Sequence, residues 1–293
     1  MSIAHGAYPQ PCPAPVHASI MRGQGPDAPP RQRHPSHAHH RFVLSDRLLG
    51  LRYLGLGLGK GYDPDVIERV GALRERYGVE LETGWGDDFI GNGAEQPTEG
   101  FATFVEQACR PLGIRVIGVC SSHHRWRQDP PLAEQMDRLA GAFGRLAPVA
   151  ERLGVVFAME NHADYRGEEV AGLIRRVNSP AFRGRLDTAN AYAVIEEPVQ
   201  ATEAMAPCVV ATHIKDVMVR PVSNGFLLTL VGCGLGEGDV DLATCVRLLA
   251  EQAPDSSSLP LMLEIEPPTG TDLAALTAQS VDYARRVFAP YLS

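Results

Sequence analysis

From Leu44 onward, short apolar runs alternate with longer amphipathic segments, and this alternation limits the possible folds more than any other feature of the chain. The amphipathic segments have helical spacing, whereas the apolar runs have the length and composition of strands. Strands that alternate with helices form a parallel sheet covered by helices. The predicted strands are residues 52–59, 79–85, 115–122, 155–161, 182–188, 209–216 and 260–266.

Seven strands are visible, whereas a closed (β/α)8 barrel needs eight. The missing strand belongs at the start, because “LSDRLLG” before the first apolar run is typical of the end of a first crossover helix. We therefore predict an α/β fold, a (β/α)8 TIM barrel over residues 42–293, with its first strand doubtful or missing. A chain of 293 residues, 44% of them hydrophobic, can bury a core of that size.

Residues 1–41 differ from the rest of the chain in composition. They hold eight prolines, six of the ten histidines and one acidic residue, Asp27. No periodic apolar face runs through them, so we predict a disordered or irregular segment without a metal site. Because it stands where the first strand is expected, we interpret it as an aberrant N-terminus, such as a misassigned start or an altered reading frame.

Charge and cysteine spacing argue against several classes of protein. A formal net charge of −8 is unsuited to nucleic acid or an anionic membrane surface. No apolar run reaches the roughly 18 residues of a membrane span, and the N-terminus lacks a signal-peptide core. The six cysteines show neither zinc-ribbon nor disulfide spacing, which predicts reduced thiols and a cytoplasmic location. A homo-oligomer stays open.

Polar side chains stand where four successive strands end, and they are Glu160, Asp187, His213 and Glu264. The first three are 27 and 26 residues apart, close to one βα unit of about 30 residues. The next interval is longer because Ser-Asn-Gly between alternating apolar residues predicts an inserted β-hairpin. Any one of these residues is more often a helix cap or a core histidine, but four on consecutive strands predict a site.

Two glutamates, one aspartate and one histidine form an oxygen-rich set of ligands. Such a set suits one divalent ion, Mn²⁺, Mg²⁺ or Co²⁺, and Zn²⁺ also fits. Glu264 and Glu266 point the same way along their strand, so the choice between them stays open. A metal ion there could bind adjacent oxygens of a polyol or keto-sugar and stabilise the enediolate that forms on deprotonation.

The segments “MENHADY”, “RLDTANAY” and “THIKD”, followed by “GEGDVDL” and “LEIEPP”, resemble the xylose-isomerase-like TIM-barrel superfamily of sugar phosphate isomerases and epimerases. The resemblance covers residues 44–290. It implies a metal-dependent enzyme whose ligands are Glu160, Asp187, His213 and Glu264. Glu160 and Glu264, on opposite sides of the metal, are then the candidate catalytic base and acid.

Two departures argue against a ketohexose 3-epimerase. Asn190 stands where sugar 3-epimerases of this superfamily carry a histidine, and Arg166 stands where they carry a second acidic residue. The resemblance thus implies an isomerase or epimerase whose partner is another sugar, keto-sugar or polyol. A metal-dependent dehydratase of the inosose or dehydroshikimate type stays open, because it uses the same metal. A third alternative also stays open, a non-catalytic relic with an incomplete barrel and unpaired strand edges.

Further polar residues are predicted at the mouth of the barrel, with Asn190 among the substrate-binding candidates. His162 and Lys215 each follow a ligand position by two residues, where they could bind substrate oxygens or steady the ligands. His123 and His124 lie on the loop after the third visible strand, and we expect one of them to touch substrate. Trp85 could stack on a sugar face or pack in the core.

Overall fold

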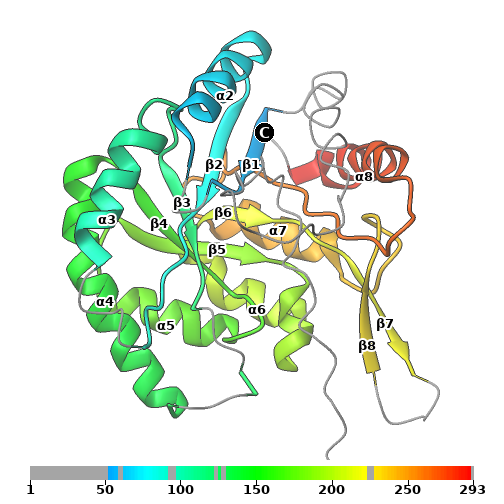
Figure 1. Ribbon diagram of the computed structural model, residues 1–293. Coiled ribbons are helices and arrows are strands. Elements are labelled where there is room, and N and C mark those ends of the chain that lie inside the picture. Colours follow the sequence, from blue (N-terminus) through cyan, green and yellow to red (C-terminus); the bar gives the residue numbers. More distant parts are fainter. Residues whose placement is uncertain are drawn as a thin grey trace, which may run out of the picture.

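Six of the seven predicted strands form one parallel sheet in the computed structural model, which describes residues 52–58, 62–91, 97–121, 125–126, 130–222 and 228–291. The strands are β1 Tyr53–Leu56, β2 Glu80–Gly84, β3 Val116–Val119, β4 Val156–Glu160, β5 Phe182–Asp187 and β6 Val209–His213. Each pairs with the next along the chain, and helices cover the outer side of the sheet (Figure 1). The predicted TIM-barrel architecture is confirmed. Residues 1–51, where the aberrant segment and the first strand are expected, lie outside the described residues.

Helix boundaries follow capping signals in the sequence. Asp63 precedes α2 (Pro64–Tyr77), and its side chain accepts a hydrogen bond from Asp65 N. Gly78 ends α2 with a φ of 62°, which a residue without a Cβ adopts most easily. The other helices are α3 Pro97–Phe104, η2 Val105–Cys109, α4 Leu132–Leu153, α5 Gly167–Val177, η3 Asn190–Val194, α6 Pro198–Met205, η4 Ala206–Cys208, α7 Leu242–Gln252, α8 Leu273–Phe288 and η5 Ala289–Tyr291. Within the described ranges, no helix is long and apolar enough to cross a bilayer.

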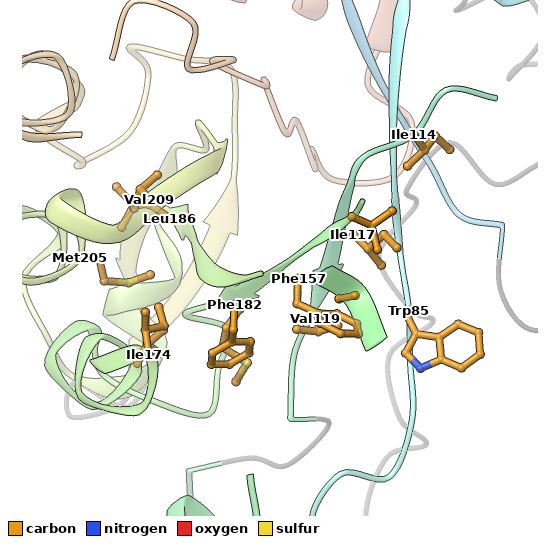
Figure 2. Close-up of a cluster of buried hydrophobic side chains, with 14 of the residues drawn as sticks. Trp85, Ile114, Ile117, Val119, Phe157, Ile174, Phe182, Leu186, Met205 and Val209 are labelled. Carbon is orange, nitrogen blue, oxygen red and sulfur yellow. The ribbon is translucent and has the colours of Figure 1, made fainter. Parts of the chain in front are cut away.

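The hydrophobic core lies between the sheet and its helices (Figure 2). On α4, Phe143, Leu146 and Ala150 recur every three or four residues, and all three are buried. The Phe143 ring stacks on Phe182 of β5, with centroids 4.4 Å apart, and meets Phe157 of β4 edge-on at 5.5 Å. This packing holds β4 and β5 in place, and their carboxyl ends carry two of the predicted ligands.

The seventh predicted strand, residues 260–266, runs parallel to β6 and joins it through a single ladder bridge. Ile214 N donates to Met262 O at 2.6 Å, and Glu264 N donates to Ile214 O at 3.0 Å. The Thr212 hydroxyl adds two hydrogen bonds, donating to Pro260 O at 2.8 Å and accepting from Met262 N at 3.2 Å. These bonds bring Glu264 to the same end of the barrel as the end of β6.

The hairpin predicted after β6 is confirmed. β7 (Val217–Pro221) and β8 (Leu228–Gly232) pair antiparallel and project away from the sheet (Figure 1). Asp216 anchors their base, because its Oδ2 accepts hydrogen bonds from Gly236 N at 2.9 Å and Gly238 N at 3.0 Å. A Cβ at residue 238 would overlap the Asp216 carboxylate. The last residue of “THIKD” therefore serves the fold of this connection.

Charged side chains occupy the barrel interior, where branched aliphatic residues are usual. Arg185 Nη2 of β5 lies 3.1 Å from Glu82 Oε1 of β2, and both side chains are buried. Two strands separate β2 from β5 in the sheet, so this ion pair must cross the concave side. Gly118 of β3 leaves room for it, because a Cβ there would overlap the Arg185 guanidinium.

We expect Gly118→Ala to lower the free energy of unfolding by about 1–3 kcal/mol, as overpacking of a core does. The added methyl must push Arg185 away from Glu82. Gly144→Ala is the matched control, because Gly144 lies at an exposed position of α4, and a Cβ there would meet no atom within 4 Å beyond the adjacent residues and the backbone of its own helix. It should be neutral or stabilising by up to about 1 kcal/mol. Urea unfolding followed by circular dichroism measures both, and equal stabilities would contradict this view of Arg185.

Candidate metal centre

Three predicted ligands meet at the carboxyl ends of β4, β5 and β6. One ligand atom from each of Glu160, Asp187 and His213 lies within 4.8 Å of the other two. Their exposed fractions are 8%, 0% and 5%, so water does not solvate the charges. The ladder pairs Asp187 directly with His213, whereas Glu160 pairs with Arg185, two residues before Asp187, so the side chain of Glu160 reaches the other two across the ladder.

Glu264 lies beside this trio. Its Oε2 is 3.6 Å from His213 Nδ1, and Glu160 Oε2 is also 3.6 Å from that nitrogen. Lys215 Nζ lies 3.1 Å from Glu264 Oε2 and forms a second ion pair with Glu266. Of the two glutamates that the sequence leaves open, Glu264 is thus the neighbour of the histidine, and Glu266 pairs with the lysine.

Side chains extend the strand ladder beyond the ends of β4 and β5. The Asn161 amide donates to Asp187 O at 2.9 Å and accepts from Asp187 N at 2.8 Å. The Thr188 hydroxyl does the same for Lys215, donating to its O at 2.7 Å and accepting from its N at 2.9 Å. These paired bonds hold the backbone on both sides of the predicted ligands, which preorganises the site.

The two oxygens of Asp187 have different surroundings. Oδ1 accepts hydrogen bonds from Ala189 N at 2.8 Å and from Asn190 N at 3.0 Å. Oδ2 is buried and accepts no hydrogen bond from the residues that the structure describes, although Lys215 Nζ lies 3.9 Å away. Asn190 also donates to Glu160 Oε1 at 3.2 Å, so it steadies two of the predicted ligands.

Charge in this part of the barrel is unbalanced. Five carboxylates share two permanent cations, Lys215 and Arg185, at no more than 3.9 Å. Among the described residues, three negative charges are therefore uncompensated when all five carboxylates are ionised and the histidine is neutral, which is costly in a buried place. The carboxylates are Glu82, Glu160, Asp187, Glu264 and Glu266.

The pKa values reflect burial and this crowding. Burial raises the pKa of Asp187 well above its ordinary value, and the Lys215 ammonium offsets only part of the rise. Burial would also raise the pKa of Glu160 and Glu264, but His213, together with Arg185 at Glu160 and Lys215 at Glu264, outweighs it and holds both below the usual range. Burial would lower the pKa of His213, yet Glu160 raises it to about 10.

The residues present fit a divalent cation. The Asp187 Oδ2 atom is buried without a hydrogen-bond donor among the described residues, and a cation would satisfy it. Two positive charges would also offset most of the excess negative charge. Carboxylate oxygens with one imidazole nitrogen are ligands that Mg²⁺, Mn²⁺, Co²⁺ and Zn²⁺ accept.

The other residues predicted to bind substrate are not part of the cluster of Glu160, Asp187 and His213. His162 is half-buried, two residues after Glu160. Trp85 is one of the buried side chains in Figure 2. Its ring centroid lies 5.8 Å from that of Phe101 and 4.8 Å from that of Phe104. These aromatic contacts agree with the alternative that Trp85 packs in the core. That Trp85 stacks on a sugar stays a prediction. His123 and His124 lie outside the described residues.

Sequence reasoning missed Glu82 and Arg185, although a signal was available. Both are charged residues inside predicted strands whose neighbours are buried, as the site glutamate of β4 is. It also missed Asp164, whose Oδ2 accepts from Ser121 N at 3.1 Å and from Ser121 Oγ at 2.6 Å. That contact ties the loop after β3 to the loop after β4.

Residues 49–287 match the family described as “Xylose isomerase-like TIM barrel”. The chain belongs to this family. The xylose isomerase-like barrel recurs in the solved structure of an L-ribulose 3-epimerase, with a TM-score of 0.65 and 18% identity over 87% of this chain and 90% of the other. It recurs in the zinc-bound IolI protein, with a TM-score of 0.67 and 19% identity over 86% and 94%. At these identities the likeness concerns the fold alone.

Two further proteins are similar to this xylose isomerase-like chain in sequence. YihM of Escherichia coli K12, an uncharacterised protein, is 24% identical over 143 residues, which are 48% of this chain and 43% of YihM. The 3-oxo-isoapionate decarboxylase of Pectobacterium atrosepticum is 26% identical over 185 residues, 61% of this chain and 59% of the decarboxylase. The chain thus spans about half the length of each.

Proposed function

We propose that this chain is a divalent-metal-dependent isomerase or epimerase that acts on a sugar, keto-sugar or polyol. One observation carries the proposal: Glu160 and Glu264, from separate strands, both lie 3.6 Å from His213 Nδ1 beside the buried Asp187. Two carboxylates that face one small site suit removal of a proton from carbon and its return.

Each residue has a task in this proposal. A bound divalent cation would act as a Lewis acid that stabilises negative charge next to a carbonyl group. Glu160 and Glu264 have pKa values below the usual range, so each is ionised at neutral pH and carries no proton of its own. Asn190 orients Glu160 through its hydrogen bond to Oε1, and Lys215 orients Glu264. Return of the proton to the neighbouring carbon gives isomerisation, and its return to the opposite face gives epimerisation.

A lyase is the second candidate. The relative named 3-oxo-isoapionate decarboxylase favours it. A carbanion next to a carbonyl can also arise by loss of carbon dioxide, and it can expel a β-hydroxyl group in place of regaining a proton, as in a dehydratase. Glu160 and Glu264 would then take part in a reaction that breaks a carbon–carbon or carbon–oxygen bond of the substrate.

Proton exchange in D₂O separates these candidates. The protein is equilibrated with Mn²⁺, freed of excess ion and incubated with a panel of ketoses and keto-polyols, and NMR follows the carbon-bound protons. An isomerase or epimerase should produce a new isomer of the sugar that carries deuterium at the reacting carbon. A lyase should release carbon dioxide or develop enone absorbance. A protein that retains Mn²⁺ but exchanges no proton in any compound would count against both, and one that binds no Mn²⁺ and unfolds without cooperativity would be the relic.

A further inference from the structure

Glu82 contacts two groups that belong to different parts of the barrel. Its Oε1 lies 3.1 Å from Arg185 Nη2 of β5 and 3.6 Å from His213 Nε2 of β6. The exposed fraction of the Glu82 side chain is 8%, so water does not stabilise its charge. A carboxylate so deeply buried requires partners, and these two side chains supply them.

The His213 ring is oriented between two sets of carboxylates. Nδ1 faces Glu160 Oε2 and Glu264 Oε2, each at 3.6 Å, whereas Nε2 faces Glu82. A histidine that binds a metal through one nitrogen commonly donates its other N–H to a carboxylate, which selects the tautomer and the ring orientation. The ring nitrogen that faces the candidate metal centre is Nδ1.

The barrel interior is shaped to hold Glu82 there. Gly118 leaves space for the Arg185 guanidinium, because a Cβ at residue 118 would overlap the guanidinium. Arg185 Nη1 lies 3.8 Å from Glu160 Oε2, so the arginine connects Glu82 to the predicted ligands.

We propose that Glu82, held by Arg185, is a positioning residue that presents Nδ1 of His213 to the metal ion. The inference rests on the proposed function, because it presupposes a metal at the Glu160, Asp187 and His213 cluster. If Glu82 and Arg185 only filled the barrel interior, removal of both charges together would leave metal affinity unchanged.

Titration with Co²⁺ tests the proposal in the purified full-length chain. Glu82→Gln should weaken Co²⁺ binding by about 10–100-fold and alter the visible absorption of the bound ion, because support for a ligating histidine is lost. Glu80→Gln is the matched control: Glu80 lies on the same strand and pairs with Arg52 at 3.2 Å, but it is exposed. It should bind Co²⁺ as wild type does.

The outcomes distinguish this inference from the proposed function. Equal affinity and an unchanged spectrum for Glu82→Gln would overturn the role of Glu82. A wild-type chain that binds no Co²⁺ would instead overturn the metal-dependent function on which it rests.

Loss of folding is handled by a second variant, because Glu82→Gln leaves Arg185 with one fewer carboxylate. Glu82→Gln combined with Arg185→Met removes both partners of the buried pair, a change that proteins often tolerate. The double variant should fold cooperatively and show the same loss of Co²⁺ affinity, and wild-type affinity would overturn the proposal. In Zn²⁺-loaded wild type, long-range ¹H–¹⁵N spectra should show His213 as the Nε2–H tautomer, and an Nδ1–H ring would overturn it without any variant.

Discussion

Replacing Asp187 with asparagine is expected to abolish metal binding while leaving the fold intact. The asparagine oxygen can still accept the hydrogen bonds that Ala189 N and Asn190 N donate to Oδ1. An amide nitrogen replaces Oδ2, however, and its N–H groups repel a cation. The loss of affinity should exceed the roughly 10–100-fold that follows loss of a residue that supports a metal ligand. Titration with Mn²⁺ after removal of bound metal measures it.

The Asp187→Asn variant should also differ from wild type in unfolding temperature. The variant should be the more stable protein without metal, and wild type should be the more stable protein with metal. Burial raises the pKa of Asp187 above its unfolded value, so the ionised form opposes folding at neutral pH, and the metal-free variant should unfold at a higher temperature. Metal at about 100 times its Kd stabilises wild type by about 2.7 kcal/mol, or roughly 5–10 °C. The variant should gain none of this, and a metal-induced shift equal to that of wild type would contradict the assignment.

Asp216→Asn is the matched control for this substitution. Asp216 is a buried aspartate on the connection after β6, and its carboxylate accepts from Gly236 N, Gly238 N and Val217 N. An asparagine amide cannot accept all of these bonds, so the variant should lose about 1–3 kcal/mol of stability. It should nevertheless bind Mn²⁺ as wild type does, which separates loss of stability from loss of the ion.

Glu264→Gln is expected to slow turnover of the sugar substrate by about 10²–10⁴-fold at saturating Mn²⁺, the usual size of a general acid–base contribution. The amide keeps the shape of the side chain, but it cannot accept the proton from carbon. It also removes the negative charge that Glu264 places beside His213 Nδ1. Deuterium incorporation from D₂O into the substrate identified by the exchange panel measures the rate.

Glu266→Gln is the control for that variant. Glu266 lies two residues further along the same segment and also pairs with Lys215, but Glu264 is the glutamate that lies beside His213. We expect a much smaller loss of rate, caused only by a less constrained lysine. Equal losses in the two variants would contradict the assignment of the catalytic carboxylate to Glu264.

Most of the candidate site could be predicted because parallel strands deliver their carboxyl ends to one face. Glu160, Asp187 and His213 each end a run of buried residues, and the fold brings one ligand atom of each within 4.8 Å of the other two. Their role as metal ligands stays a prediction. The choice between Glu264 and Glu266 needed the structure, because alternation along a strand assigns both to one side but sets no distance to a histidine on another strand.

The sequence by itself determined the order of strands and helices, the inserted hairpin and the strand ends where chemistry is expected, because periodicity and capping are local properties of the chain. The tertiary structure alone decided that Glu82 meets Arg185 and His213 across the barrel interior. It also decided that Asn161 bridges to the backbone of Asp187. Such contacts depend on the curvature of the sheet and on small residues such as Gly118 on an intervening strand, and no pattern within a single strand encodes that distance.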